Sequence, residues 1–292
     1  AVLALALTVH GKIAAQDFTL PADLADLSLE ETRKSLIAFV NFAATPGIEG
    51  ATFRIDEPTR DSYLRRSSLG FATDVAVRDH VFDGYWGAAL SYAHLDDDIL
   101  VLDSNADPRQ VDVDRKILSL SGSVGLSLPL DQHFRLRPYL SVAVSRLETD
   151  SAIDEFSEPL DLPRALLENK VNALTTSLTL EADYDRWYAD RRLQLGVHYT
   201  AGYTDTFDAS HNTFDTWGWS GTAVLRSRFS ADTGWRSRGR NWRWAVYADH
   251  TRLQDLERAA LGFTYYTEIG FGFDYEVSFR PLDWYGPRLL GF

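Results

Sequence analysis

The sequence predicts an all-β protein: an antiparallel transmembrane β-barrel of about twelve strands, ten to twelve of them in this chain, with an N-terminal helix in its lumen. The clearest observation is residues 118–130, LSLSGSVGLSLPL, where aliphatic residues alternate with small or hydroxylated ones. A period of two held this long exceeds the five or six residues typical of strands in soluble sheets. In a membrane barrel, lipid covers the aliphatic side and water in the lumen solvates the hydroxyls.

Composition is compatible with this prediction. The chain of 292 residues has a net charge of -13, no Cys and no Met, and its mean hydropathy is -0.22. Half of each barrel strand is polar, so a polar average is expected. The absence of Cys excludes disulfide scaffolds and thiolate metal sites, and the acidic balance argues against a nucleic-acid partner.

The N-terminal segment, residues 1–17, is a short apolar run that ends near Ala14 and Ala15. An apolar run followed by small residues is typical of the end of a secretory signal peptide. The alternative interpretation is a first strand or a hydrophobic arm. Because no initiator Met is present, we expect the natural chain to begin further upstream.

Residues 18–46 are expected to hold the helix that plugs the lumen. Ser28 and Glu31 form a capping box, a run of good helix formers follows to Ala44, and Pro46 with Gly47 ends it. One face of this helix is predicted to be apolar, formed by Leu29, Leu36, Ile37, Val40 and Ala44.

Residues 47–292 are predicted to form the barrel, because the period becomes two from Gly47 onward. The expected strands cover about residues 47–57, 63–78, 85–95, 111–130, 134–148, 169–184, 191–204, 213–229, 242–252 and 259–279. Residues 287–292 would begin an eleventh strand, and bacterial barrels have even strand numbers.

The connections alternate in kind, which favours a barrel over a soluble sandwich. Those after every second strand are compact, whereas residues 96–109 and 149–168 are long and acidic, with one helical turn expected at residues 164–167. Outer-membrane barrels have short periplasmic turns and long outer loops, so these two loops could contact an unknown protein partner. Aromatic residues gather near the compact turns and are expected at the membrane interface: Trp86, Trp187, Tyr188, Trp235, Trp242, Trp284 and Tyr285.

The inward-facing sets contain charges of both signs. In the dry core of a soluble β-sandwich, the rival architecture, unpaired charges would each cost several kcal/mol. In a lumen they are solvated or paired with each other or with Glu30 and Glu31 of the helix; an anion path is the alternative. The predicted lumen-facing charges are Arg66, Asp74, Arg135, Arg137, Glu181, Asp183, Arg192, Arg226, Arg228, Arg243, Glu268, Asp274 and Glu276.

A helix that leads into about twelve antiparallel strands resembles the translocator domain of bacterial autotransporters. The alternation of Gly and aromatic residues in 261–279 and the turn at 280–285, RPLDWY, carry the same resemblance. It implies a helix that threads the lumen, insertion by the barrel-assembly machinery, and a location in the outer membrane among lipid and lipopolysaccharide. Few residues separate the expected signal peptide from Ser28, so a barrel without a passenger is expected.

A search for catalytic residues finds no G-x-S-x-G, H-E-x-x-H or P-loop motif. Ser91 and His94 have opposite parity and should lie on opposite faces, as should Asp249 and His250, while His198 points inward. We therefore expect no catalytic residues and no cofactor. An acidic cluster could bind calcium or contact lipopolysaccharide through divalent ions, or simply be a solvated loop. It comprises Asp96, Asp97, Asp98, Asp103, Asp107, Asp112 and Asp114.

Three functions remain open at this point. The first is a non-enzymatic, translocator-like structural component of the bacterial outer membrane. The second is a pore for small solutes, with Arg135 and Arg137 setting its selectivity. The third is an outer-membrane hydrolase of lipid or peptide that would use His94, His198 or His250.

Overall fold

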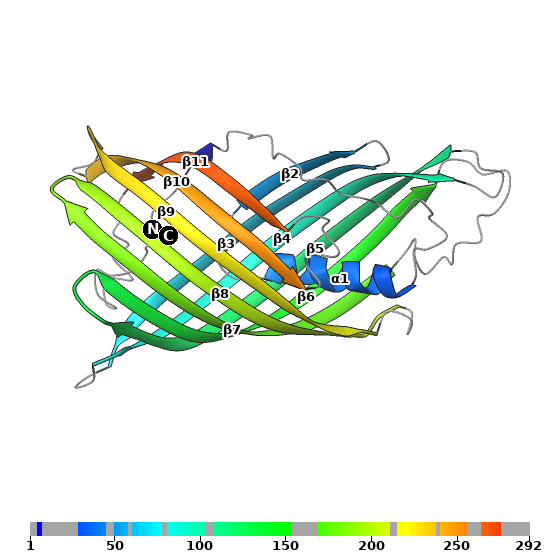
Figure 1. The fold of residues 1–292 in the computed structure, drawn as a ribbon, viewed down its shortest axis with the longest axis horizontal. Helices are drawn as coiled ribbons and strands as arrows, with labels where there is room; N and C mark the ends of the chain where they lie inside the picture. The colour runs from blue at the N-terminus through cyan, green and yellow to red at the C-terminus, as the bar shows by residue number, and fades with distance from the viewer. Residues whose placement is uncertain are drawn as a thin grey trace.

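The computed structural model describes residues 5–7, 29–44, 50–57, 60–77, 81–102, 108–153, 169–210, 215–237, 240–255 and 264–275. These residues form one antiparallel sheet of eleven strands and one helix. In this part of the chain no helix has the length and apolarity needed to cross a membrane. The sheet curls around the helix into a barrel wall (Figure 1).

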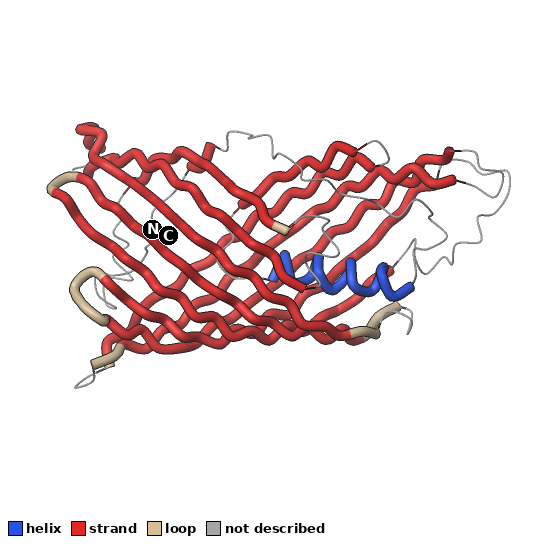
Figure 2. The backbone as a smooth tube through the Cα atoms, viewed as in Figure 1, coloured by secondary structure: helices blue, strands red, loops and turns tan. Residues whose placement is uncertain are grey.

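The strands pair in chain order, except that β1 joins the far edge, beside β11. The helix is α1, Leu29–Ala44. The strands are β1 Leu5–Leu7, β2 Gly50–Glu57, β3 Arg60–Ala76, β4 Asp83–Leu102, β5 Pro108–Pro129, β6 Phe134–Ile153, β7 Asn169–Tyr188, β8 Arg191–Phe207, β9 Trp217–Ser237, β10 Arg240–Asp255 and β11 Tyr265–Tyr275. Strands make up most of the described backbone (Figure 2).

The two ends of the barrel differ in their connections. The short-turn end carries residues 77–82, 130–133, 189–190 and 238–239 between consecutive strands. The opposite end, which we call the long-connection end, carries residues 58–59, 103–107, 154–168, 208–216 and 256–264, of which the last three connections are longer than any at the short-turn end. This asymmetry agrees with the predicted alternation, since outer-membrane barrels have short periplasmic turns and longer outer loops.

Several predicted boundaries were wrong because the strands are longer than their apolar segments. The predicted loop 96–109 is largely strand: β4 continues to Leu102 and β5 begins at Pro108. The first residues of the predicted loop 149–168 belong to strand β6, which ends at Ile153. Each extension is paired with a neighbouring strand, and backbone hydrogen bonds hold it whatever the side chains are.

Smaller corrections apply near the C-terminal half. The predicted turn from residue 185 shrinks to the two residues after Tyr188, and β9 runs on to Ser237. Strand β11, Tyr265–Tyr275, lies within the predicted strand 259–279, whose residues 259–263 and 276–279 are outside the described part of the chain. The helical turn at 164–167 and the strand at 287–292 lie outside the described residues. The described sheet has eleven strands, so the total of about twelve stays a prediction.

The N-terminal segment contributes β1, which pairs with β11 through Leu5 opposite Phe273 and Leu7 opposite Phe271. The strand forms, as the alternative interpretation of this segment expected. Cleavage of a signal peptide in residues 1–17 stays a prediction, as does the division of the chain at residues 17 and 46. Within the described residues β1 and β2 are the two edge strands of the sheet, with no pairing between them.

The two faces of the wall follow the predicted parity. Leu120, Leu140 and Leu178 expose 62%, 53% and 56% of their surface, although each lies in the middle of a long strand. Residues that alternate with them, such as Ser119 and Ser141, are buried on the inner face. An apolar outside and a polar inside exclude the rival sandwich, in which these leucines would meet in a dry interior.

Candidate functional site in the lumen

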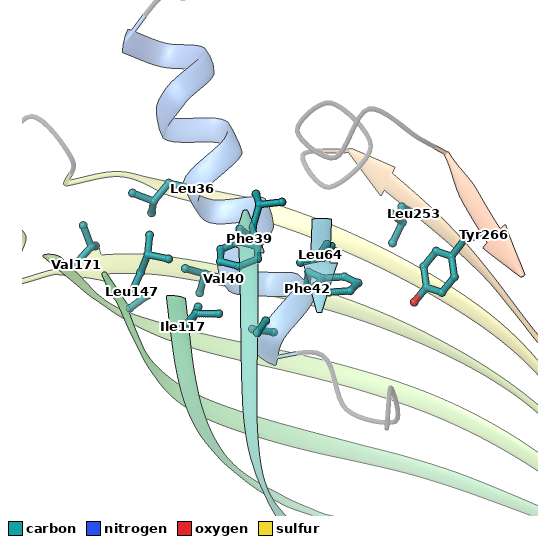
Figure 3. Packing of buried hydrophobic residues seen from close by; sticks show 14 residues of the cluster. Leu36, Phe39, Val40, Phe42, Leu64, Ile117, Leu147, Val171, Leu253 and Tyr266 are labelled. Carbon is teal, nitrogen blue, oxygen red and sulfur yellow. The ribbon is translucent and has the colours of Figure 1, made fainter. Parts of the chain in front are cut away.

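The helix α1 fills the lumen in the half of the barrel nearer the long-connection end. Every residue from Leu36 to Ala44 is buried, with at most 7% of its surface exposed. Phe39, Val40 and Phe42 belong to one apolar cluster with wall residues (Figure 3). The wall side of the cluster is formed by Leu64, Ala93, Leu95, Ile117, Leu147, Val171, Ala173, Leu253 and Tyr266.

The sequence predicted one apolar helix face, but residues 36–44 are buried on all sides. The reason is that the wall surrounds the helix instead of flanking it, and α1 contacts strands from β4 to β9. Burial of a large apolar side chain such as Phe39 or Phe42 stabilises this docking by about 1.5–3 kcal/mol each. The pairing predicted for Glu30 and Glu31 concerns side chains outside the described set.

Polar contacts hold the C-terminal end of α1. The last carbonyl groups of a helix have no partner within it. Here the carbonyl oxygen of Ala43 accepts a hydrogen bond from Ser91 Oγ at 2.7 Å and another from Arg66 Nη2 at 3.1 Å. The Arg66 guanidinium also lies 5.3 Å from the centre of the Phe42 ring, and Thr204 donates to the side-chain oxygen of Asn41. These contacts come from strands far apart in the sequence.

Hydroxyl side chains line the middle of the inner wall and bond across neighbouring strands. The four pairs are Ser119–Ser145 at 2.9 Å, Ser123–Ser141 at 2.7 Å, Thr175–Thr204 at 2.7 Å and Thr179–Thr200 at 2.8 Å. Because each hydroxyl both donates and accepts, such pairs satisfy each other without charge. They separate the apolar region around α1 from a charged region beyond it.

The charged region lies nearer the short-turn end. Arg135 donates to Asp74 at 2.9 Å, although their strands β6 and β3 are separated by β4 and β5. Arg137 donates to Glu181 at 2.7 Å and to Asp183, and lies 3.4 Å from Asp74. One guanidinium therefore holds three carboxylates and ties β3 to β7 across the inside of the wall.

The absence of a side chain at Gly125 on β5 leaves room for the contacts that Arg135 and Arg137 make over β4 and β5 with Asp74 on β3. Tyr85, Gly125 and Tyr139 are direct neighbours in one register row across β4, β5 and β6. The two rings meet above the glycine with centroids 5.0 Å apart, and Arg137 lies 5.7 Å from the Tyr85 ring. A side chain at position 125 would fill the space in which Tyr139 lies.

At the short-turn mouth, the Trp187 ring has two arginines near it. The guanidinium carbons of Arg192 and Arg243 lie 5.2 and 4.6 Å from its centre. Arg192 also pairs with Asp185 at 2.9 Å, and Arg243 donates to the carbonyl of Asp190 at 2.9 Å. Trp187 thus shares the inner-face parity of these arginines, which sets it apart from the other predicted interface aromatics.

The remaining predicted residues are placed as follows. Arg226 lies 3.6 Å from Asp249 on the inner face, and Arg228 and Glu268 are half-buried at inner-face positions. Trp86, Tyr188 and Trp235 have exposed side chains and Trp242 is half-buried. The side chain of Asp274 and the whole of Glu276, Trp284 and Tyr285 lie outside the described set. The lumen and interface roles of these residues stay predictions.

The three histidines considered as catalytic candidates, all among the described residues, have other partners than a serine or stand opposite a carboxylate. His94 Nε2 lies 3.1 Å from Asp114 on the outer side of the wall, whereas Ser91 bonds to the helix on the inner side. His250 bonds to Thr267 at 2.8 Å. His198 is buried on the inner wall, opposite Glu181 in the neighbouring strand. Among the described residues no group of three or more potential metal ligands gathers.

The predicted acidic cluster is divided between the faces of the wall. Asp97 is buried on the inner face and accepts a hydrogen bond from Ser62 at 2.6 Å. Asp114, on the outer face, lies 3.1 Å from both His94 and Lys116. Asp96, Asp98 and Asp112 lie within strands, while Asp103 and Asp107 are outside the described residues. The prediction that Asp96, Asp97 and Asp98 lie in a loop is wrong, because β4 continues through them and alternates their side chains between its faces.

Sequence reasoning missed the residues that connect the helix to the wall. Asn41 and Ser91 carry no motif, and their roles depend on where α1 docks. Gly125 could have been noticed in the sequence, because every other inward residue from Ser119 to Ser127 is serine. That it lies between two tyrosines is visible only in the structure.

An antiparallel membrane barrel with a polar inner wall and a helix in its lumen is the class that this geometry defines. A comparison with family models identifies residues 82–249, more than half of the chain, as an autotransporter beta-domain. The chain belongs to this family, whose members are translocator barrels. The crystal structure of the beta domain of the Bordetella autotransporter BrkA is similar, with 12% identity, a TM-score of 0.45, and coverage of 79% of this chain and 96% of that one. None of the curated proteins compared with the chain matches it.

Proposed function

We propose that this protein is an outer-membrane translocator barrel whose lumen is closed by α1 and which has no enzymatic activity of its own. The observation that carries the proposal is the complete burial of residues 36–44 inside the wall. The anchoring of the Ala43 carbonyl by Ser91 and Arg66 supports it, because these bonds hold the helix at a defined depth. A helix held in this way blocks the lumen.

Electrical recording in planar bilayers tests the plug. The chain has no cysteine, so the pair Asn41→Cys and Thr204→Cys, whose side chains are in contact, can form one defined disulfide between helix and wall. We expect low conductance with brief openings from the native chain. Oxidation of the double variant should abolish the openings, and reduction should restore them. The single variant Asn41→Cys is the control and should not respond.

A second variant acts in the opposite direction. Phe39→Asp places a charge in the apolar cluster around α1 and should release the helix, giving a large steady conductance. If the oxidised double variant already conducts steadily and Phe39→Asp changes nothing, the plug does not exist. The pore for small solutes would then be the better function, and Arg135→Glu should alter its ion selectivity.

The absence of enzymatic activity has its own test. Incubation of the refolded barrel with panels of lipids and peptides should give no turnover. Turnover that is lost on replacing His94, His198 or His250 would establish the hydrolase alternative.

A further inference from the structure

The lipid-facing side of the wall has an ordered charge pattern on β3 to β7. On each strand, we followed the outward side chains from the apolar region toward the long-connection end. Beyond the continuous apolar run of each strand, the first Asp, Glu, His, Lys or Arg is basic on all five neighbouring strands. These apolar runs end at Leu69, Tyr92, Leu118, Val144 and Leu174. The five basic residues, here called the basic edge, are Arg65, His94, Lys116, Arg146 and Lys170.

Strand register brings the basic edge together. Arg65 is directly opposite His94, and His94 is directly opposite Lys116. The row continues through Glu148 to Lys170, while Arg146 lies two residues nearer the apolar region on β6. With strands about 4.8 Å apart, four steps extend over roughly 19 Å. Residues separated by about a hundred positions thus form one continuous row.

Carboxylates on the outer side fix these bases in place. Asp114 lies 3.1 Å from His94 and 3.1 Å from Lys116. Glu148 lies 3.2 Å from Arg146 and 3.8 Å from Lys170. The four permanently charged bases share two carboxylates at the level of the edge, whereas the outward side chains next toward the long-connection end, Asp96, Asp112 and Asp150, are acidic, so basic groups are gathered in the edge itself. All these side chains are partly exposed, so they remain accessible to an anion.

The inner side of the same wall segment is the apolar cluster around α1. Leu64, Ile117, Leu147 and Val171 are each adjacent in sequence to a member of the row and point inward. The next outward side chains toward the short-turn end are Tyr92 and Leu118, which are exposed, as expected for side chains in contact with lipid. The edge therefore lies where the apolar region ends, at the level of lipid phosphates.

We propose that the basic edge binds the phosphate groups of lipid A in the outer leaflet. The leaflet follows from the position at the long-connection end, which rests on the outer-membrane location proposed above. The ligand follows from the length of the row: a diphosphorylated disaccharide can contact bases on several strands at once, whereas a glycerophospholipid presents one phosphodiester. Arginine and lysine are the usual phosphate-binding side chains.

Titration of lipid A onto the refolded barrel in detergent, followed by native mass spectrometry, tests the proposal. The test variant is Arg65→Gln with Lys116→Gln and Lys170→Gln. Each basic group near an anionic lipid surface contributes roughly fivefold in affinity, so diphosphoryl lipid A should bind about a hundredfold more weakly. The native chain should bind monophosphoryl lipid A and phosphatidylglycerol at least ~10-fold more weakly than the diphosphoryl form.

The matched control removes three positive charges at the other end of the barrel. Arg186→Gln with Arg191→Gln and Arg236→Gln changes exposed side chains near the short-turn end, and should leave lipid A affinity unchanged. Both triple variants should keep the heat-modifiable gel mobility of a folded barrel. Equal losses in the two variants, or equal binding of phosphatidylglycerol and diphosphoryl lipid A, would overturn the proposal. Neither result depends on the conductance that tests the plug.

Discussion

Gly125 gives the sharpest test of the packing inside the wall. In a strand, replacing glycine by alanine ordinarily stabilises the protein by about 0.5–1 kcal/mol, because glycine loses more conformational freedom on folding. At Gly125 a new Cβ would overlap the carbonyl oxygen of Pro138 and the Cβ of Tyr139, and would lie 2.6 Å from the Tyr139 Cα. These atoms belong to the backbone of β6 or are attached directly to it.

The cost of Gly125→Ala follows from those contacts. Rotation of the Tyr139 ring cannot relieve them, so β6 must move away from β5 by about 1 Å, and overpacking of this kind costs roughly 1–3 kcal/mol. The movement would also part Tyr85 from Tyr139 and pull Arg137 from its carboxylates. After subtraction of the glycine gain, the net destabilisation ranges from about 0 to 2.5 kcal/mol, with a middle value of about 1 kcal/mol.

The control is Gly122→Ala on the same strand. Gly122 faces outward, and an added Cβ there meets no atom within 4 Å. This variant should be neutral or more stable than the native chain by up to about 1 kcal/mol. Urea unfolding of the refolded barrels, followed by tryptophan fluorescence and gel mobility, measures both. If Gly125→Ala is as stable as Gly122→Ala, the packing argument fails.

Three further predictions concern charge and turns. Arg137→Ala leaves Asp74, Glu181 and Asp183 without their shared cation in a partly buried site and should cost about 3–5 kcal/mol, measured by urea midpoint; an unchanged midpoint would show that water alone solvates these carboxylates. Asp131 accepts hydrogen bonds from two backbone N–H groups of its turn, which lower its pKa. Because the folded-state pKa is depressed, this stabilisation is complete above the unfolded pKa of about 3.9 and is lost as pH falls through the folded value. The native chain should therefore exceed Asp131→Ala in stability at pH 6, with the difference shrinking below about pH 4; a constant difference would contradict this. Ala189, in the two-residue turn between β7 and β8, has a φ of 55°. Glycine adopts that conformation without steric cost, so Ala189→Gly should stabilise by up to about 1 kcal/mol in the same unfolding assay, and a loss of stability would count against the strain.

The face on which each residue lies could be predicted from the sequence. Side chains of a strand alternate strictly, so parity alone assigned Leu120 to lipid and Arg137 to the lumen. The helix was equally readable, because its capping box and its proline stop are local signals, and the structure places it at Leu29–Ala44. Both features depend only on neighbours in the chain.

Tertiary structure decided everything that joins distant strands. The length of β4 depended on backbone pairing with β5, because Asp96, Asp97 and Asp98 show no alternation of their own. The contact of Asp74 with Arg135 and the row from Arg65 to Lys170 depended on the register of neighbouring strands. Register depends on the exact turn that joins each pair of strands, and an error of one residue in a predicted turn shifts every pair, so these sites became visible only in the folded barrel.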